Sequence, residues 1–280
     1  MAATIPEELK KDLPQTAWGK ILTATPVIMT VIATLLAGLA SSEMTSAQYD
    51  RALGAQLQSK AGDQWSYFQA KKLRGAIQRS SLELLQATTD VRPVANAALE
   101  KIPAVAAPSL DANLQAALDA VARERPETEI TAALKPVKDQ ALAAALQAAR
   151  DQAREFDTAL APANQALAQL EKSLPAGDKS AARDLTAARM RFAAMRYDAE
   201  AGLNQNIANL LELQVRKANI SAERHHARSL RFFCGMLAAQ AAVIVSTLAM
   251  AARQRNLLWT LAAVAGIAAI IFAIYVYLRV

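Results

Sequence analysis

The sequence holds a single cysteine and only two histidines, and both scarcities exclude classes of site. Cys234 has no second cysteine to pair with, so a disulfide or a cysteine-based metal centre cannot form within the chain. His225 and His226 are neighbours, and neighbouring side chains on a helix diverge by about 100°, so the pair cannot chelate one ion. Ordinary polarity beside a membrane is the simpler interpretation of this pair, and a headgroup-level or pH-sensitive role is the alternative. We expect no metal and no cofactor.

Enzyme signatures are missing as well. The 280 residues include nine glycines, and none of them forms a phosphate-binding loop. There is no H-E-x-x-H motif, and no serine or cysteine is set beside a plausible base. The net charge is +6, but no basic patch with interleaved aromatic residues occurs, which argues against a nucleic-acid partner. We predict that the protein is not an enzyme and binds no nucleic acid.

The chain does contain three apolar stretches without any charged residue, at residues 21–40, 232–252 and 257–278. Each is about 20 residues long, which as a helix matches a hydrocarbon core of about 30 Å. The sequence therefore predicts three transmembrane helices. Their interiors hold no ionisable side chain, which argues against a proton-coupled transporter.

The first stretch has a second interpretation as a cleaved signal peptide. Lys10, Lys11 and Lys20 precede it, and Gly38-Leu39-Ala40 resembles a cleavage site. The charged leader is long, however, and the apolar stretch exceeds an ordinary signal core. These two lengths favour a retained transmembrane helix.

Proline divides the region between the first two apolar stretches into three parts. Residues 41–90 and 178–231 contain no proline, so each can form one long helix. Residues 91–177 hold all seven prolines of this region: Pro93, Pro103, Pro108, Pro126, Pro136, Pro162 and Pro175. We predict an all-α fold in which an ascending and a descending stalk helix pair antiparallel below an Ala-rich helical cap. A tail (1–20) and a basic link (253–256) complete the chain.

The cap carries a heptad pattern, in which apolar residues recur in alternating steps of four and three. The pattern comprises Leu142, Leu146, Ala149, Ala153, Phe156, Leu160, Ala163, Leu167, Leu170 and Leu174. Such spacing predicts coiled-coil packing, and its alanines predict a closely approached interface. Pro162 lies off this stripe and is expected to kink the helix.

The orientation in the membrane follows from tryptophans and basic residues. Trp18 and Trp259 begin the first and third apolar stretches, and three crossings place both at one interface. The tail lysines and the link Arg253–Arg255 share that side, which the positive-inside rule makes cytoplasmic. We therefore predict a multi-pass protein of the bacterial inner (plasma) membrane with a periplasmic stalk and cap. Basic residues at the other end of the stalk argue for the reverse: Arg216, Lys217, Arg224, Arg228 and Arg231.

The segment DQWSYFQAKKLR, residues 63–74, concentrates aromatic residues in a chain that is only 5% aromatic. Trp65 and Phe68 are three residues apart, so on a helix they face one partner, which we expect to be residues 192–210. Tyr67 points elsewhere, and Lys71 follows it by four residues. We predict that Trp65 and Phe68 pack within the protomer while Tyr67 and Lys71 face a neighbouring subunit. A small-ligand site is the alternative.

The same motif carries a family resemblance. The segment EMTSAQYDRALGAQLQSKAGDQWSYFQAKKLR resembles the bacterial membrane family called domain of unknown function 4337. The matching residues are Asp63, Gln64, Trp65, Tyr67, Gln69, Ala70 and Lys71, with Phe68 in place of a second tyrosine. HHARSLRFF and RQRNLLW resemble the family's return segment, whereas residues 91–177 have no counterpart that we can place. The resemblance implies one span, a helical excursion and two closing spans, but no activity, ligand or partner.

These features favour a membrane-anchored helical scaffold or interaction protein that carries no chemistry of its own. Its expected partners are the lipid bilayer, further copies of itself in a homo-oligomer and, in addition, another membrane protein complex. An oligomeric pore or transport accessory, with a chamber formed by the stalks, is the alternative.

Overall fold

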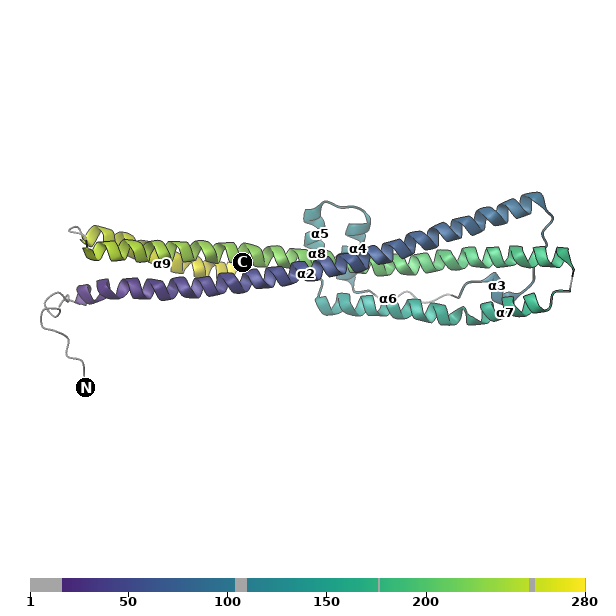
Figure 1. Cartoon of the computed structure of the whole chain (residues 1–280), viewed down its shortest axis with the longest axis horizontal. Helices are drawn as coiled ribbons and strands as arrows, with labels where there is room; N and C mark the ends of the chain where they lie inside the picture. The colour runs from purple at the N-terminus through teal and green to yellow at the C-terminus, as the bar shows by residue number, and fades with distance from the viewer. Residues whose placement is uncertain (1–16, 104–109, 176, 252–254, 280) are drawn as a thin grey trace, which may run out of the picture. The chain divides into compact units, whose positions relative to one another are not determined.

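A computed structural model describes residues 17–103, 110–175, 177–251 and 255–279, and these residues form helices and connecting segments without any strand. The helices are α2 (Ala17–Thr88), α3 (Ala97–Glu100), α4 (Ala112–Ala122), α5 (Glu127–Leu134), α6 (Asp139–Ala159), α7 (Ala161–Lys172), α8 (Lys179–Ala251) and α9 (Arg255–Arg279) (Figure 1). The predicted all-α class is confirmed. The predicted tail (1–20) and link (253–256) lie at least in part outside the described residues.

The two long helices owe their length to the near-absence of proline. α8 runs for 73 residues without a proline, and α2 runs for 72 residues with Pro26 as its single proline. Proline lacks the N–H that would bond to the carbonyl four residues earlier. Near this point the Thr30 hydroxyl donates to the Pro26 carbonyl at 2.8 Å, and α2 continues unbroken. Each long helix therefore joins an apolar segment to a polar one without a break.

Proline and capping residues divide the intervening region into short helices. Asn96 and Asp111 accept backbone N–H groups at the starts of α3 and α4, and Asp178 accepts two at the start of α8. The sequence predicts that Pro162 kinks one continuous helix, and this prediction is wrong. Instead α6 ends at Ala159 and α7 begins at Ala161, with Pro162 in the first turn. Proline is tolerated there because the first-turn N–H groups have no helical acceptor.

The chain forms two compact units. The first comprises residues 1–52 and 219–280, and the second comprises residues 53–218. α2 and α8 contribute residues to both units, whereas α3 to α7 belong to the second and α9 belongs to the first.

The core of the second unit lies between α8 and the helices of the cap region (Figure 1). Its buried residues are Leu99, Phe156, Leu160, Ala163, Leu167, Leu185 and Phe192. All ten residues of the heptad pattern are buried or half-buried, so this stripe is covered by packing within the chain. Knobs-into-holes packing itself stays a prediction, because the stripe is divided between two helices that meet at Leu160.

In the first unit, unlike the second, most of the large aliphatic side chains lie on the surface rather than in the interior. Most of its buried residues are small, among them Ala33, Ala40, Ala239, Ala242, Ala262 and Ala269, whereas Met29, Leu36 and Phe232 are larger buried residues. Its exposed surface carries large aliphatic residues, among them Val27, Val31, Leu35, Leu237, Ile244, Leu248, Val264 and Ile267. α2 and α8 are long and apolar enough to cross a membrane, and the described part of α9 contains a shorter apolar stretch, Thr260–Phe272.

Truncating a core residue of the second unit tests its packing. Phe156 is 2% exposed, so Phe156→Ala should lower the free energy of unfolding by about 3–5 kcal/mol through lost burial and a residual cavity. The measurement is thermal unfolding followed by the helical circular dichroism signal. The exposed neighbour Glu155 provides the control, because Glu155→Ala should change stability by less than about 0.5 kcal/mol. Equal midpoints for the two variants would contradict this core.

Candidate functional site

The aromatic segment lies in the part of α2 that belongs to the second unit. The Trp65 and Phe68 rings pack edge to face, with centroids 5.5 Å apart and an angle of 85° between the planes. Both side chains are half-buried rather than fully buried, so truncating Trp65 should cost less than removing a core aromatic residue. Tyr67 is 56% exposed, which agrees with its predicted outward direction.

Lys71 does not point toward a neighbouring subunit beside Tyr67 but toward α8, and this part of the prediction is wrong. Its ammonium pairs with the Glu200 carboxylate of α8 and lies over the Tyr197 ring at 5.5 Å from the centroid. Lys71 follows Phe68 by three residues and precedes Gly75 by four, so it belongs to the face of α2 that packs on α8. Glu200 lies within residues 192–210, which the sequence predicts to lie opposite this segment, but the pattern did not identify this carboxylate as the partner of Lys71.

Glu200 is the buried centre of this polar cluster. Its side chain is 8% exposed, and its second oxygen accepts from Arg196 Nε at 2.6 Å. A buried carboxylate needs such compensation, because leaving water removes its hydration. Two cations from two helices therefore hold one carboxylate, and the contact fixes α2 against α8 at this level.

A second ion-pair group lies close by in sequence. Arg79 of α2 contacts both oxygens of Asp198, at 2.8 and 3.4 Å, and Lys72 approaches the same carboxylate at 3.7 Å. These groups are more exposed than Glu200, so solvent weakens their attraction. Gly75, four residues after Lys71, lies beside Ala194, six residues before Glu200, so α2 and α8 run antiparallel within the second unit.

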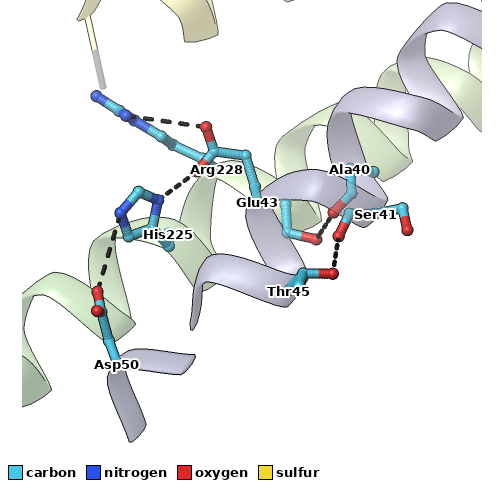
Figure 2. A network of polar contacts seen from close by, with 8 residues as sticks. Ala40, Ser41, Glu43, Thr45, Asp50, His225 and Arg228 are labelled. Atoms are coloured by element: carbon cyan, nitrogen blue, oxygen red, sulfur yellow. Dashed lines mark hydrogen bonds and ion pairs between the residues drawn. The ribbon is translucent and has the colours of Figure 1, made fainter. Parts of the chain in front are cut away.

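The first unit contains a polar network that the sequence did not predict (Figure 2). One carboxylate oxygen of Glu43, in α2, lies 2.6 Å from His225 Nδ1, and the other lies 3.9 Å from Arg228 Nη1. Asp50, two turns further along α2, lies 3.9 Å from His225 Nε2. Figure 2 shows the His225 ring between the two carboxylates. One histidine thus bridges two acidic residues of the facing helix.

Adjacent contacts continue this network toward the apolar segments. The buried Ser229 hydroxyl donates to the Ala40 carbonyl at 2.7 Å, and Phe232 packs with Leu36 and Ala40. Leu36, Ala40, Glu43, Ala47 and Asp50 recur in steps of four and three along α2, all buried or half-buried. That spacing was the available signal, because two carboxylates on an otherwise apolar stripe require polar partners.

His225 and His226 diverge, as their adjacency predicts. His225 faces Glu43 and Asp50, whereas His226 Nδ1 is buried without a hydrogen-bond partner. Within the residues that the structure describes, no group of three acidic, histidine or cysteine side chains is placed to hold a metal ion. A cavity of about 260 Å³ lies elsewhere in the second unit, lined by residues that include Arg92, Leu99 and Arg191. The predicted interaction residues do not line it. The polar clusters around Glu200 and around Glu43 each connect α2 to α8, so their contacts can hold these two helices together.

Residues 18–168 match the model of a family described as Domain of unknown function (DUF4337). The match covers more than half of the 280 residues and includes the aromatic segment 63–74. It also includes residues 91–168, so the expectation that the cap region lacks a counterpart is wrong for that part. The return segment, HHARSLRFF onward, lies beyond the match. No curated protein and no solved structure matches the chain.

The Glu200 cluster yields a prediction about which partner matters most. Lys71 and Arg196 are 24% and 35% exposed, so without Glu200 their charged ends can turn toward water, and Glu200→Gln should cost only about 1 kcal/mol. Replacing both cations by methionine leaves the buried carboxylate unpaired and should cost about 3–5 kcal/mol. Urea unfolding measures the free energy of unfolding of both variants. A larger loss of stability in Glu200→Gln than in the double methionine variant would contradict the assignment of Glu200 as the buried charge that depends on its two cations.

The histidine network yields a second comparison. Glu43 makes the short contact to His225 and also faces Arg228, so Glu43→Ala should lower the unfolding free energy by about 1–3 kcal/mol. Asp50 makes only a long contact, and Asp50→Ala should have a smaller effect. The thermal midpoints of the two variants in the same detergent provide the test. An equal or larger shift for Asp50→Ala would show that the network is centred elsewhere.

Proposed function

Because the chain belongs to the DUF4337 family, whose description assigns no activity, we propose a function from the site and the fold: a membrane-anchored helical scaffold that assembles with copies of itself and carries no chemistry of its own. The first unit would be the anchor. The second unit would extend into the aqueous phase and present surfaces to partners.

The observation that carries this proposal is the distribution of side chains in the first unit. Many large aliphatic residues are exposed, whereas most of the residues buried between the helices are alanine, glycine or serine. In water such a surface would be unfavourable, because each exposed Leu or Ile side chain forgoes about 1.5–3 kcal/mol of transfer free energy. In lipid the outward residues are solvated, and small residues allow close helix packing. Gly266 fits this pattern, since an added Cβ would overlap the Met29 side chain.

The proposed topology has three crossings, in α2, α8 and α9. The tail lysines and the link Arg253–Arg255 would lie in the cytoplasm, and the second unit in the periplasm of a bacterial cell. The heptad stripe of the cap is covered within the chain, so assembly must use a different surface.

Anchoring predicts that the protein stays in the membrane fraction after alkaline carbonate washing, because three crossings cannot be released by removing peripheral contacts. Sidedness is measured with single cysteines in a Cys234→Ala background, which contains no other thiol. In intact cells, a membrane-impermeant maleimide should label Gln115→Cys, an exposed residue of α4. It should label Gln254→Cys, in the basic link, only after permeabilisation.

The two parts of this experiment separate two claims. Release of the protein by carbonate would overturn membrane anchoring. Labelling of Gln254→Cys but not of Gln115→Cys in intact cells would preserve anchoring and reverse the proposed orientation.

A further inference from the structure

α2 carries apolar residues on a second face within the second unit. Leu73, Ile77 and Leu84 are 63%, 52% and 66% exposed. At about 100° per residue they lie within about 40° of one another and roughly opposite Lys71 and Gly75, which face α8. α2 is therefore apolar on the side away from its partner helix as well as toward it.

The exposed stripe extends over much of α2. Its members are Ala55, Ser59, Gly62, Ser66, Ala70, Leu73, Ile77, Ser80, Leu84 and Ala87, all exposed and separated by three or four residues. We name this set the outer α2 face. It contains no charged residue, and the charges of the same stretch lie to its sides or on the opposite side of the helix. A helix face that meets only water is normally charged or strongly polar, so this composition indicates a surface that is covered in the working protein.

We propose that the outer α2 face binds the same face of a second copy of the chain, with the two α2 helices parallel. This inference rests on the proposed membrane anchoring, because copies inserted in one bilayer in the same orientation direct their α2 helices the same way. Steps of three and four are the spacing by which parallel helices interlock.

Charge supports a second copy as the occupant. Identical faces that meet around a two-fold axis oppose each residue to its own counterpart, so a charged stripe would repel itself. The outer α2 face has no charge to repel. From Ala70 onward, a parallel pair has Ala70, Ile77 and Leu84 at one heptad position; before Ala70 two successive steps of four interrupt the heptad, so Asp63 lies beside the face rather than on it. In this register the flanking residue Gln69 meets Arg74 of the copy, and Glu83 meets Thr88. Neither flanking pair brings like charges together.

The size of the face is sufficient for a membrane-bound pair. Residues 55–87 extend for about 50 Å along the helix, and a stripe about 10 Å wide would bury about 500 Å² on each copy. The total of about 1,000 Å² reaches the lower limit for a specific interface. Confinement to one bilayer raises the effective concentration of the two copies, so a contact of this size can hold.

Cysteine cross-linking in membranes tests the contact. In the Cys234→Ala background, Ile77→Cys and Leu84→Cys should form disulfide-linked dimers on mild oxidation, because opposed positions of a parallel pair come within disulfide reach. Tyr67→Cys and Lys60→Cys are matched controls, since both positions are exposed on α2 but lie off the outer face. We expect at least about tenfold more dimer from the two outer-face variants.

Other results would overturn the proposal. Dimers from Tyr67→Cys alone would place the contact between copies at the Tyr67 side of α2, as the sequence predicts. Dimers only from a mixture of Gly62→Cys and Leu84→Cys would indicate antiparallel helices. Protection of Ile77→Cys from maleimide without any dimer would indicate that lipid or another protein covers the face.

A charge variant separates this inference from the proposed anchoring. The double variant Ile77→Glu, Leu84→Glu should abolish the dimer that chemical cross-linking detects. Its helicity and its sedimentation with membranes after carbonate washing should stay unchanged. The control variant Lys60→Glu should still form the dimer. Loss of sedimentation by the unmodified protein would refute anchoring. A sedimenting protein whose dimer survives both glutamates would refute the outer α2 face alone.

Discussion

A long helix must bury an apolar stripe against another helix, and in this chain α8 provides that surface for most of the others. An isolated helix of 73 residues with mixed polarity gains little from intrinsic propensity, so tertiary contacts must stabilise it. In the second unit α8 contacts α2 through Glu200 and Asp198, and contacts the cap core through Leu185 and Phe192. In the first unit it contacts α2 again, and Gly235 approaches Phe272 of α9.

Polar clusters add positional information that apolar packing lacks. Alanine-rich helix surfaces are nearly uniform along their length, so they can slide past one another with little loss of contact. A buried or half-buried carboxylate cannot slide, because a shift of one turn separates it from its cations. Glu200 in the second unit and Glu43 in the first therefore each fix the alignment of α2 with α8 locally. This role for buried polar groups resembles that of a polar residue in a coiled-coil seam.

The helical class and the cap stripe could be predicted because each depends on local order. Proline-free stretches favour long helices, and steps of four and three identify Phe156 and Leu167 as facing a partner. The direction of Lys71 could not be predicted, since it depends on a carboxylate that lies far away in sequence. For the network of Glu43 and His225, the two carboxylates on an apolar stripe were a local signal that polar partners were needed, but this signal did not identify His225 as the partner. The break at Leu160 was misjudged because proline can either kink a helix or begin a new one.

The contrast in side-chain size between the two units also determines which substitutions each can tolerate. Leu213 and Ala239 are both fully buried in α8, one in each unit. At Leu213 a smaller residue leaves a void, and a similar-sized one such as methionine is tolerated. At Ala239, packed with Ala33 and Ala269, shrinkage removes little, whereas any added carbon forces neighbouring helices apart. Sequence divergence within a single helix should therefore follow two opposite rules: a lower limit on volume in one unit and an upper limit in the other.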